Sequence, residues 1–214
     1  SFAVCYERCL SPRFETLSKN ACLIDLTDGA EAAFSRFHPT ARNEVRRTEK
    51  MDALCFRTGI EVDFDAYYPF YAACEHARGW LPVPEDELRH SLVFTAYLDD
   101  KPFSGMSAYF HKNRLRVGRI YSLKKTHTDS RLNNLVYGSA ARRIVFELCK
   151  YGAENGFTTL DLGGIDLRDP AKAGIARFKQ SFGGEIAPVI LARFARPCFS
   201  NALPQIRLAG YDLT

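Results

Sequence analysis

Two spacings of apolar residues alternate along the chain, and each predicts a different kind of element. Short apolar or alternating runs predict strands at residues 21–26, 54–57, 93–98, 103–110, 115–121, 158–162 and 185–194. Apolar positions three and four residues apart, together with capping residues, predict helices at residues 30–37, 40–51, 64–78, 85–90, 131–155 and 170–182. From residue 54 onward the order is strand, two helices, three strands, helix, strand, helix, strand.

Turn and capping residues separate these elements. The pair His38-Pro39 ends one helix before the next begins, because a residue that precedes proline avoids the helical conformation. Segment 99–101 (DDK) predicts a hairpin turn, so the three central strands should meander antiparallel. The pair Asp169-Pro170 predicts a capped helix start with proline in the first turn.

This element order predicts a mixed α/β sheet flanked by helices, and it matches the topology of the GNAT N-acyltransferases. We expect strand 158–162 to diverge from its neighbour and leave a cleft. The expected division is an N-terminal strand and basic helical extension at residues 1–52, a GNAT-like domain at 53–196 and a tail at 197–214. Because one fold serves many activities, the site residues must indicate the function.

Composition narrows the class of protein. With 46% hydrophobic and 25% charged residues, the chain is neither disordered, collagenous nor a coiled coil. A net charge of +4 does not by itself indicate a nucleic-acid binder. No apolar run is long enough for a membrane helix and no signal peptide is visible, so we expect a cytoplasmic protein without a transmembrane segment. Seven scattered cysteines and five histidines predict no disulfide framework and no metal site.

The first candidate motif is segment 161–166 (DLGGID), at the expected end of a strand. Ligands bind near the carboxyl ends of strands, and Gly163 and Gly164 allow a close approach to the backbone. Asp161 and Asp166 are candidates for orienting an amine or accepting its proton. The alternative is a tight connection that needs positive φ angles and capping carboxylates.

The second motif is segment 174–185 (GIARFKQSFGGE). Ile175, Phe178 and Phe182 form one buried stripe, and Arg177 and Lys179 flank it. We expect Lys179 to be largely exposed and to project toward the open end of strand 158–162. There its ammonium would contact a phosphate of an acyl donor or a developing oxyanion. The alternative is that both cations face solvent.

The third feature is a basic helix at residues 40–51. Arg42, Arg46 and Lys50 recur every four residues, and Arg47 lies beside them. An anionic ligand is one interpretation and a solvated face is the other. The stretch 112–143 adds nine basic residues against one acid, which also suggests an anionic ligand.

Together these motifs resemble the Fem family, the FemAB-like peptidoglycan-bridge aminoacyltransferases of the GNAT superfamily. The resemblance covers about residues 20–195. The segments that carry it are 24–26, 34–37, 42–50, 78–79, 133–135, 161–165 and 174–183.

The resemblance implies transfer of an aminoacyl group from aminoacyl-tRNA to an amine of a cell-wall precursor. Phe178 and Lys179 match the Phe-Lys pair that the family associates with its nucleic-acid donor, and Arg42, Arg46 and Arg47 match its basic helix. Such chemistry needs an acyl donor, aminoacyl-tRNA or acyl-CoA, but no tightly bound cofactor. Segment 124–134 lacks the glycines that hold the pyrophosphate of CoA at a helix start, which favours the nucleic-acid donor.

Two alternatives remain. One is an acyltransferase that uses CoA or acyl carrier protein in polysaccharide assembly. The other is a noncatalytic module that keeps the GNAT scaffold and binds RNA or a precursor. An open channel through the sheet beside residues 161–165 would favour an enzyme.

Overall fold

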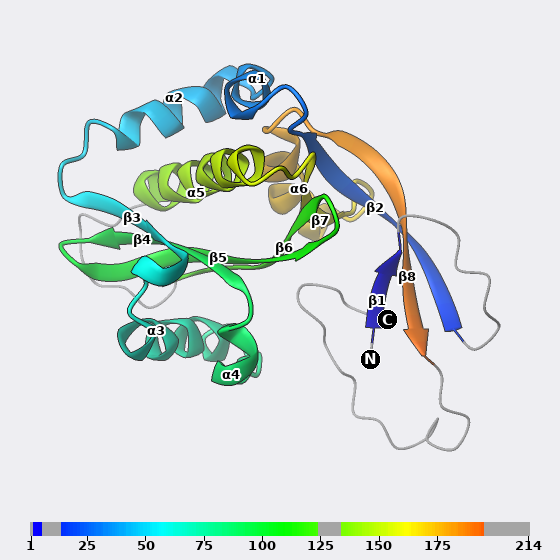
Figure 1. Ribbon diagram of the computed structural model, residues 1–214, viewed down its shortest axis with the longest axis horizontal. Helices are drawn as coiled ribbons and strands as arrows, with labels where there is room; N and C mark the ends of the chain where they lie inside the picture. The colour runs from blue at the N-terminus through cyan, green and yellow to red at the C-terminus, as the bar shows by residue number, and fades with distance from the viewer. Residues whose placement is uncertain (1, 6–13, 124–133, 195–214) are drawn as a thin grey trace.

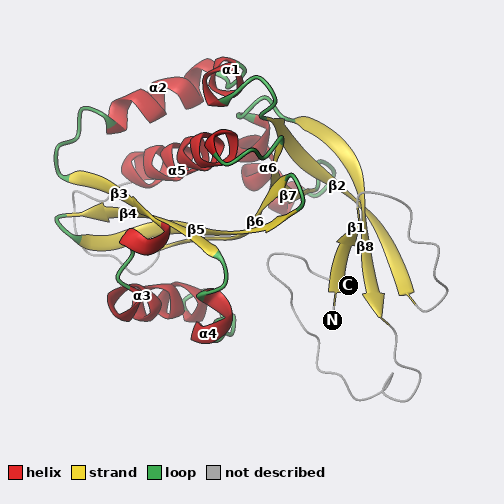
Figure 2. Ribbon diagram, viewed as in Figure 1, coloured by secondary structure: helices red, strands yellow, loops and turns green. Residues whose placement is uncertain are grey.

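The computed structural model describes residues 2–5, 14–123 and 134–194 (Figure 1). Its strands all belong to one sheet, and its helices cover both faces of that sheet (Figure 2). The strands are β1 (Phe2–Cys5), β2 (Phe14–Asp25), β3 (Leu54–Thr58), β4 (Leu92–Leu98), β5 (Lys101–His111), β6 (Arg114–Ser122), β7 (Thr159–Ile165) and β8 (Glu185–Phe194).

In the described part of the chain these strands are arranged β1-β8-β2-β7-β6-β5-β4-β3. Neighbours run antiparallel except β6 and β7, which are parallel and are joined by a long helix. A parallel pair needs such a crossover connection. The mixed α/β sheet expected from the sequence is therefore confirmed.

Helices cover both faces of the β3–β7 part of the sheet (Figures 1 and 2). In one layer the crossover helix α5 (Asn134–Glu154) lies next to the sheet, and α1 (Ala30–Ser35) and α2 (Pro39–Thr48) pack on its outer side. The opposite layer holds α3 (Phe64–His76) and α4 (Glu85–Leu88). Helix α6 (Ala173–Gln180) follows a 3-10 turn at Pro170–Lys172 and contacts β7. No helix in the described ranges is long and apolar enough to cross a membrane.

The core divides at the sheet into two clusters. On the α5 side, Phe37 packs edge-to-face on Phe182 with ring centroids 5.0 Å apart, and Phe34 contacts Phe146 at 4.5 Å. On the α3 side, buried tyrosines dominate, and Tyr121 is among them. Burying each large apolar side chain contributes about 1.5–3 kcal/mol, so both layers are held firmly against the sheet.

Four elements differ from the sequence-based expectation. Strand β1 pairs with β8, although no strand was expected before residue 21. Strand β2 begins at Phe14, because it pairs with β8 from Phe14 to Leu23 and also with β7. Strand β7 continues through Gly163 and Gly164 to Ile165, where a loop was expected. The last helix begins as a 3-10 turn. Since β2 lies between β7 and β8, the sheet joins strands from both sides of residue 52.

The strands that matter most for the site are β6 and β7, which separate partway along their length. They pair only from Arg114–Thr159 to Arg116–Asp161 in the described structure. Beyond that point β6 continues to Ser122 alongside β5, and β7 continues to Ile165 alongside β2. The divergence expected from the sequence is confirmed.

Gly183 provides a test of how α6 is anchored. It connects α6 to β8 with a φ of 64°, and a Cβ at this position would collide with the backbone carbonyl of Arg36 at the end of α1. We expect Gly183→Ala to destabilise the fold by about 2–4 kcal/mol, because neither the left-handed backbone nor a neighbouring backbone can adjust cheaply.

The matched control is Gly174→Ala, in the helix that precedes Gly183, where a Cβ meets nothing within 4 Å. Because alanine favours a helix more than glycine does, it should leave the stability unchanged or raise it by up to about 1 kcal/mol. Urea unfolding monitored by circular dichroism measures both, and equal stabilities for the two variants would contradict this packing.

Candidate active site

A cavity of about 370 Å³ opens where β6 and β7 separate. Its walls come from the region after α3, from the diverging halves of the two strands, and from α6 with the turn before it. Its lining residues are Arg78, Trp80, Val117, Gly118, Arg119, Ile120, Leu162, Gly163, Gly164, Asp166, Lys172, Ile175 and Lys179. Four of these side chains are basic and one is acidic, so the cavity suits an anionic ligand.

Lys179 lies on the α6 side of this cavity. Its Nζ donates a hydrogen bond of 2.6 Å to the carbonyl of Gly164, and the residue is only 8% exposed. The sequence-based expectation of a largely exposed side chain is therefore wrong, although the direction toward the end of β7 is confirmed. Desolvation lowers the pKa of Lys179 to about 8, and the Asp161 carboxylate opposes that shift.

Asp161 is completely buried behind the cavity lining. Its carboxylate forms an ion pair with Arg116, and its Oδ1 accepts a hydrogen bond of 2.6 Å from the Gly163 amide. Gly163 has a φ of 77°, so the tight turn considered from the sequence is present inside a strand. Asp161 thus holds the backbone and the charges of the site in place, whereas the described cavity is lined by its neighbours.

Asp166 lines the cavity at the end of β7. Its Oδ1 accepts a hydrogen bond of 3.1 Å from the Arg168 amide, which fixes the carboxylate at the turn. Among the sequence-based candidates, the cavity therefore brings together Gly163, Gly164, Asp166 and Lys179.

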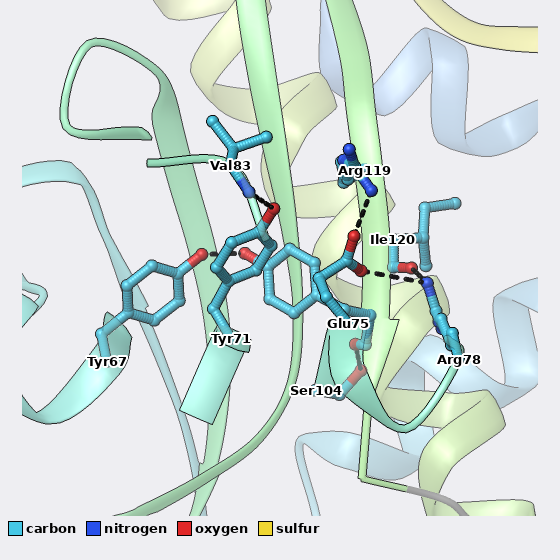
Figure 3. Close-up of polar contacts among 9 residues, drawn as sticks. Tyr67, Tyr71, Glu75, Arg78, Val83, Ser104, Arg119 and Ile120 are labelled. Carbon is cyan, nitrogen blue, oxygen red and sulfur yellow. Dashed lines mark hydrogen bonds and ion pairs between the residues drawn. The ribbon is translucent and has the colours of Figure 1, made fainter. Parts of the chain in front are cut away.

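The wall opposite α6 contains residues that sequence analysis did not select. Glu75 of α3 is completely buried and forms an ion pair with Arg119 of β6 (Figure 3). Arg78 Nη1 lies 3.6 Å from Glu75 Oε1 and donates a hydrogen bond of 2.5 Å to the Ile120 carbonyl. Burial raises the pKa of Glu75, and the two guanidinium groups partly reverse the shift.

A β-bulge explains why Arg119 could not be placed from the sequence. Ala108 pairs with Val117 but Ser107 pairs with Arg119, so Gly118 is an extra residue in β6. The bulge reverses the alternation of faces. Val117 packs in the α5-side cluster, whereas Tyr121, which simple alternation would put on the same face, packs under α3. The only sequence signal for Arg119 was the basic excess in residues 112–143.

The other candidates lie outside the described cavity lining. Arg42 donates hydrogen bonds to the carbonyls of Ser35 and Phe37, so its guanidinium caps the end of α1. Arg46 lies over the Phe34 ring, and Arg47 and Arg177 are exposed.

Phe178 packs on Phe182, with ring centroids 5.0 Å apart, and under the Arg142 guanidinium. Most of segment 124–134, the expected donor loop, lies outside the described residues.

The fold with this cleft is the GNAT fold that the element order predicts, and solved structures confirm it. FemX superposes with a TM-score of 0.61 and 13% identity, over 88% of this chain and 65% of its own. The C-terminal domain of a protein assigned as a lysylphosphatidylglycerol synthetase, from Agrobacterium fabrum, superposes with a TM-score of 0.59 and 13% identity. The match covers 84% of this chain and 61% of that chain. L-PGS from Bacillus licheniformis superposes with a TM-score of 0.56 and 11% identity, over 86% of this chain and 62% of that chain.

These likenesses confirm, at the level of fold, the resemblance to the Fem family and its GNAT relatives. The chain spans less than two thirds of the length of each of these proteins. No family model matches the sequence, and no curated protein sequence matches it.

The pH dependence of stability tests the environment of Lys179. Its pKa is about 8 in the folded protein and near 10.5 in the unfolded chain. Between these values the unfolded chain binds more protons at this site than the folded protein does. Raising the pH through this window therefore stabilises the fold at this site, whereas Lys179→Met lacks the contribution.

We expect wild type to gain on the order of 2 kcal/mol relative to Lys179→Met as the pH rises through this window. Taking the difference between the two proteins cancels the titration of the buried tyrosines, which do not interact with Lys179. Urea unfolding at a series of pH values measures the difference in free energy of unfolding between wild type and Lys179→Met. If this difference does not change with pH, Lys179 is not desolvated.

Proposed function

We propose that this chain is an N-acyltransferase of FemAB-like type, which transfers an aminoacyl or related acyl group to an amine. The observation that carries the proposal is the cavity between the diverging halves of β6 and β7, with the Lys179 ammonium fixed beside it. A cavity beside residues 161–165 favours an enzyme over a noncatalytic scaffold.

Direct transfer requires no covalent intermediate on the enzyme. The amine nitrogen forms a bond to the acyl carbon while the bond between that carbon and the rest of the donor breaks. The rest of the donor departs as the leaving group with the electron pair of that bond, and finally takes up the proton that the amine releases. Lys179 stabilises the oxyanion that develops on the carbonyl, and a desolvated site strengthens that interaction. Asp166, which lines the same cavity, accepts the proton that the attacking amine loses.

The proposed donor is an aminoacyl-tRNA or another nucleic-acid-linked acyl group. Lys172 and Lys179, the basic side chains on the α6 side of the cavity, support a polyanionic donor. The absence of glycine from segment 124–134 in the sequence supports it further, because CoA-dependent relatives hold a pyrophosphate with such glycines.

The proposed acceptor is an amine of a cell-wall or cell-surface precursor. The resemblance of the motifs to the Fem family supports this class, and so does the similarity of fold to FemX and L-PGS. This part of the proposal rests on likeness, whereas acyl transfer itself rests on the geometry of the cleft.

A transfer assay with labelled donors tests the proposal. We expect wild type to transfer the label from an aminoacyl-tRNA to an amine acceptor faster than from acetyl-CoA. Lys179→Met should lower the rate about 10- to 100-fold, the scale of losing one charged contact to a developing oxyanion.

The matched control is Lys150→Met on α5, whose ammonium pairs with Glu147 at 2.7 Å and lies outside the cavity lining. It should keep the wild-type rate. Efficient use of acetyl-CoA would instead favour the CoA-dependent alternative, and binding without transfer from either donor would favour a noncatalytic module.

A further inference from the structure

The wall of the cavity opposite Lys179 carries more positive charge than the mechanism above uses. It consists of Arg78, Trp80 and Arg119, which we call the arginine wall. Two guanidinium groups here face one carboxylate, that of Glu75. The Arg119 side chain is only 10% exposed and that of Arg78 28%, so a net positive charge is held in a largely desolvated place. Such a charge is costly unless an anion accompanies it.

The side chains of the arginine wall are fixed before any ligand arrives. Glu75 contacts Arg119 through one oxygen and faces Arg78 with the other (Figure 3). Both guanidinium carbons lie 5.6 Å from the centroid of the Trp80 ring, so the indole contacts both cations. Groups held in place in this way lose little conformational freedom when a ligand binds.

The hydrogen-bonding capacity of the arginine wall is also not exhausted. A guanidinium has five N–H donors. Arg119 donates to Glu75 through Nη1, and Arg78 donates to the Ile120 carbonyl through Nη1. The Nε of Arg119 is buried and has no hydrogen-bond partner among the described residues. A buried donor of this kind is normally satisfied, which points to a missing acceptor for the Arg119 guanidinium.

We infer that the arginine wall binds an acidic group, a carboxylate or a phosphate, on the acceptor amine, and that Glu75 is the positioning residue that orients both arginines. This inference rests on the proposed function, because it names the chemical class of the acceptor. Guanidinium groups pair with carboxylates and phosphates through parallel hydrogen bonds, and the indole packs against the neighbouring carbon atoms of the ligand. The acidic group then holds the amine in the same cavity as Lys179 and Asp166.

The chain has a single tryptophan, Trp80, so its fluorescence reports on this wall alone. The experiment titrates the protein with matched pairs of small amines. Alanine is compared with alaninamide, which lacks the carboxylate, and phosphoethanolamine with ethanolamine, which lacks the phosphate. We expect a saturable change in Trp80 emission with the acid-bearing member of at least one pair, and binding at least about tenfold weaker for its neutral partner. Which pair responds distinguishes carboxylate from phosphate.

Two variants assign the response to the wall. Arg78→Gln leaves the buried pair of Glu75 and Arg119 intact, so the protein should fold, and it should weaken binding of the acidic probe about tenfold. Arg89→Gln is the matched control, because Arg89 also lies over an aromatic ring, that of Phe64, but outside the cavity lining. It should bind the probes as wild type does.

Glu75→Gln tests the positioning role. If Glu75 orients the arginines, the variant loses the preference for the acidic probe over the neutral one, and Glu75→Asp restores part of it. A purely structural role would lower the melting temperature without changing that preference, and this result would overturn the role of Glu75.

Equal binding of acidic and neutral probes, or no saturable response to either acidic probe, overturns the inference. Its failure is distinguishable from failure of the proposed function. Acyl transfer to neutral amines as fast as to acid-bearing amines would contradict only the inference that the arginine wall binds an acidic group on the acceptor. Acid-selective binding without transfer from any donor would contradict only the enzyme activity.

Discussion

The buried ion pair between Arg116 and Asp161 lies at the fork of the sheet, and the site depends on it. These two residues are also the last ones that pair across β6 and β7 before the strands separate. Removing either partner would leave a buried charge uncompensated, which typically costs about 3–5 kcal/mol. The pair therefore fixes the point at which the cleft begins.

The same carboxylate organises the α6 side of the cleft. Asp161 accepts a hydrogen bond from the Gly163 amide. This bond stabilises the left-handed turn that presents the Gly164 carbonyl to Lys179. Its charge also favours the protonated form of Lys179, against the desolvation that lowers its pKa. Across the cavity, Glu75 has a comparable arrangement with Arg78 and Arg119. On one side a fully buried carboxylate fixes the backbone that holds Lys179, and on the other it holds the two arginines directly, as expected of a preorganised electrostatic site.

Local patterns predict the elements well, because caps, turns and helical stripes act over a few residues. The hairpin at Asp99 and Asp100 is an example, since both residues adopt the positive φ angles that such a turn requires. For the same reason the motif 161–166 and Lys179 could be selected for the site. The burial of Lys179 could not, because it depends on contacts with Gly164 and Cys22, which are distant in sequence.

The arginine wall could not be predicted for similar physical reasons. Arg119 reaches the α3 side only because the bulge at Gly118 reverses the strand. The isolated glycine is compatible with a bulge but does not by itself establish one, since glycine in a strand has other causes. Glu75 lies at the end of a predicted helix rich in aromatic residues, and nothing in the sequence distinguishes it from the other charged positions there. Conversely, the regular spacing of Arg42 and Arg46 suggested a ligand, whereas Arg42 caps α1 and Arg46 packs on Phe34.

The central claim is that acyl transfer takes place in the cleft between β6 and β7. The most direct measurement is a crystal structure of the protein with a non-hydrolysable acyl-donor analogue. The account predicts that the acyl carbonyl oxygen lies within hydrogen-bonding distance of Lys179 Nζ, with the acyl group between the diverging strands. A donor bound along α2 by Arg46 and Arg47, with its acyl group outside the cleft, would contradict it.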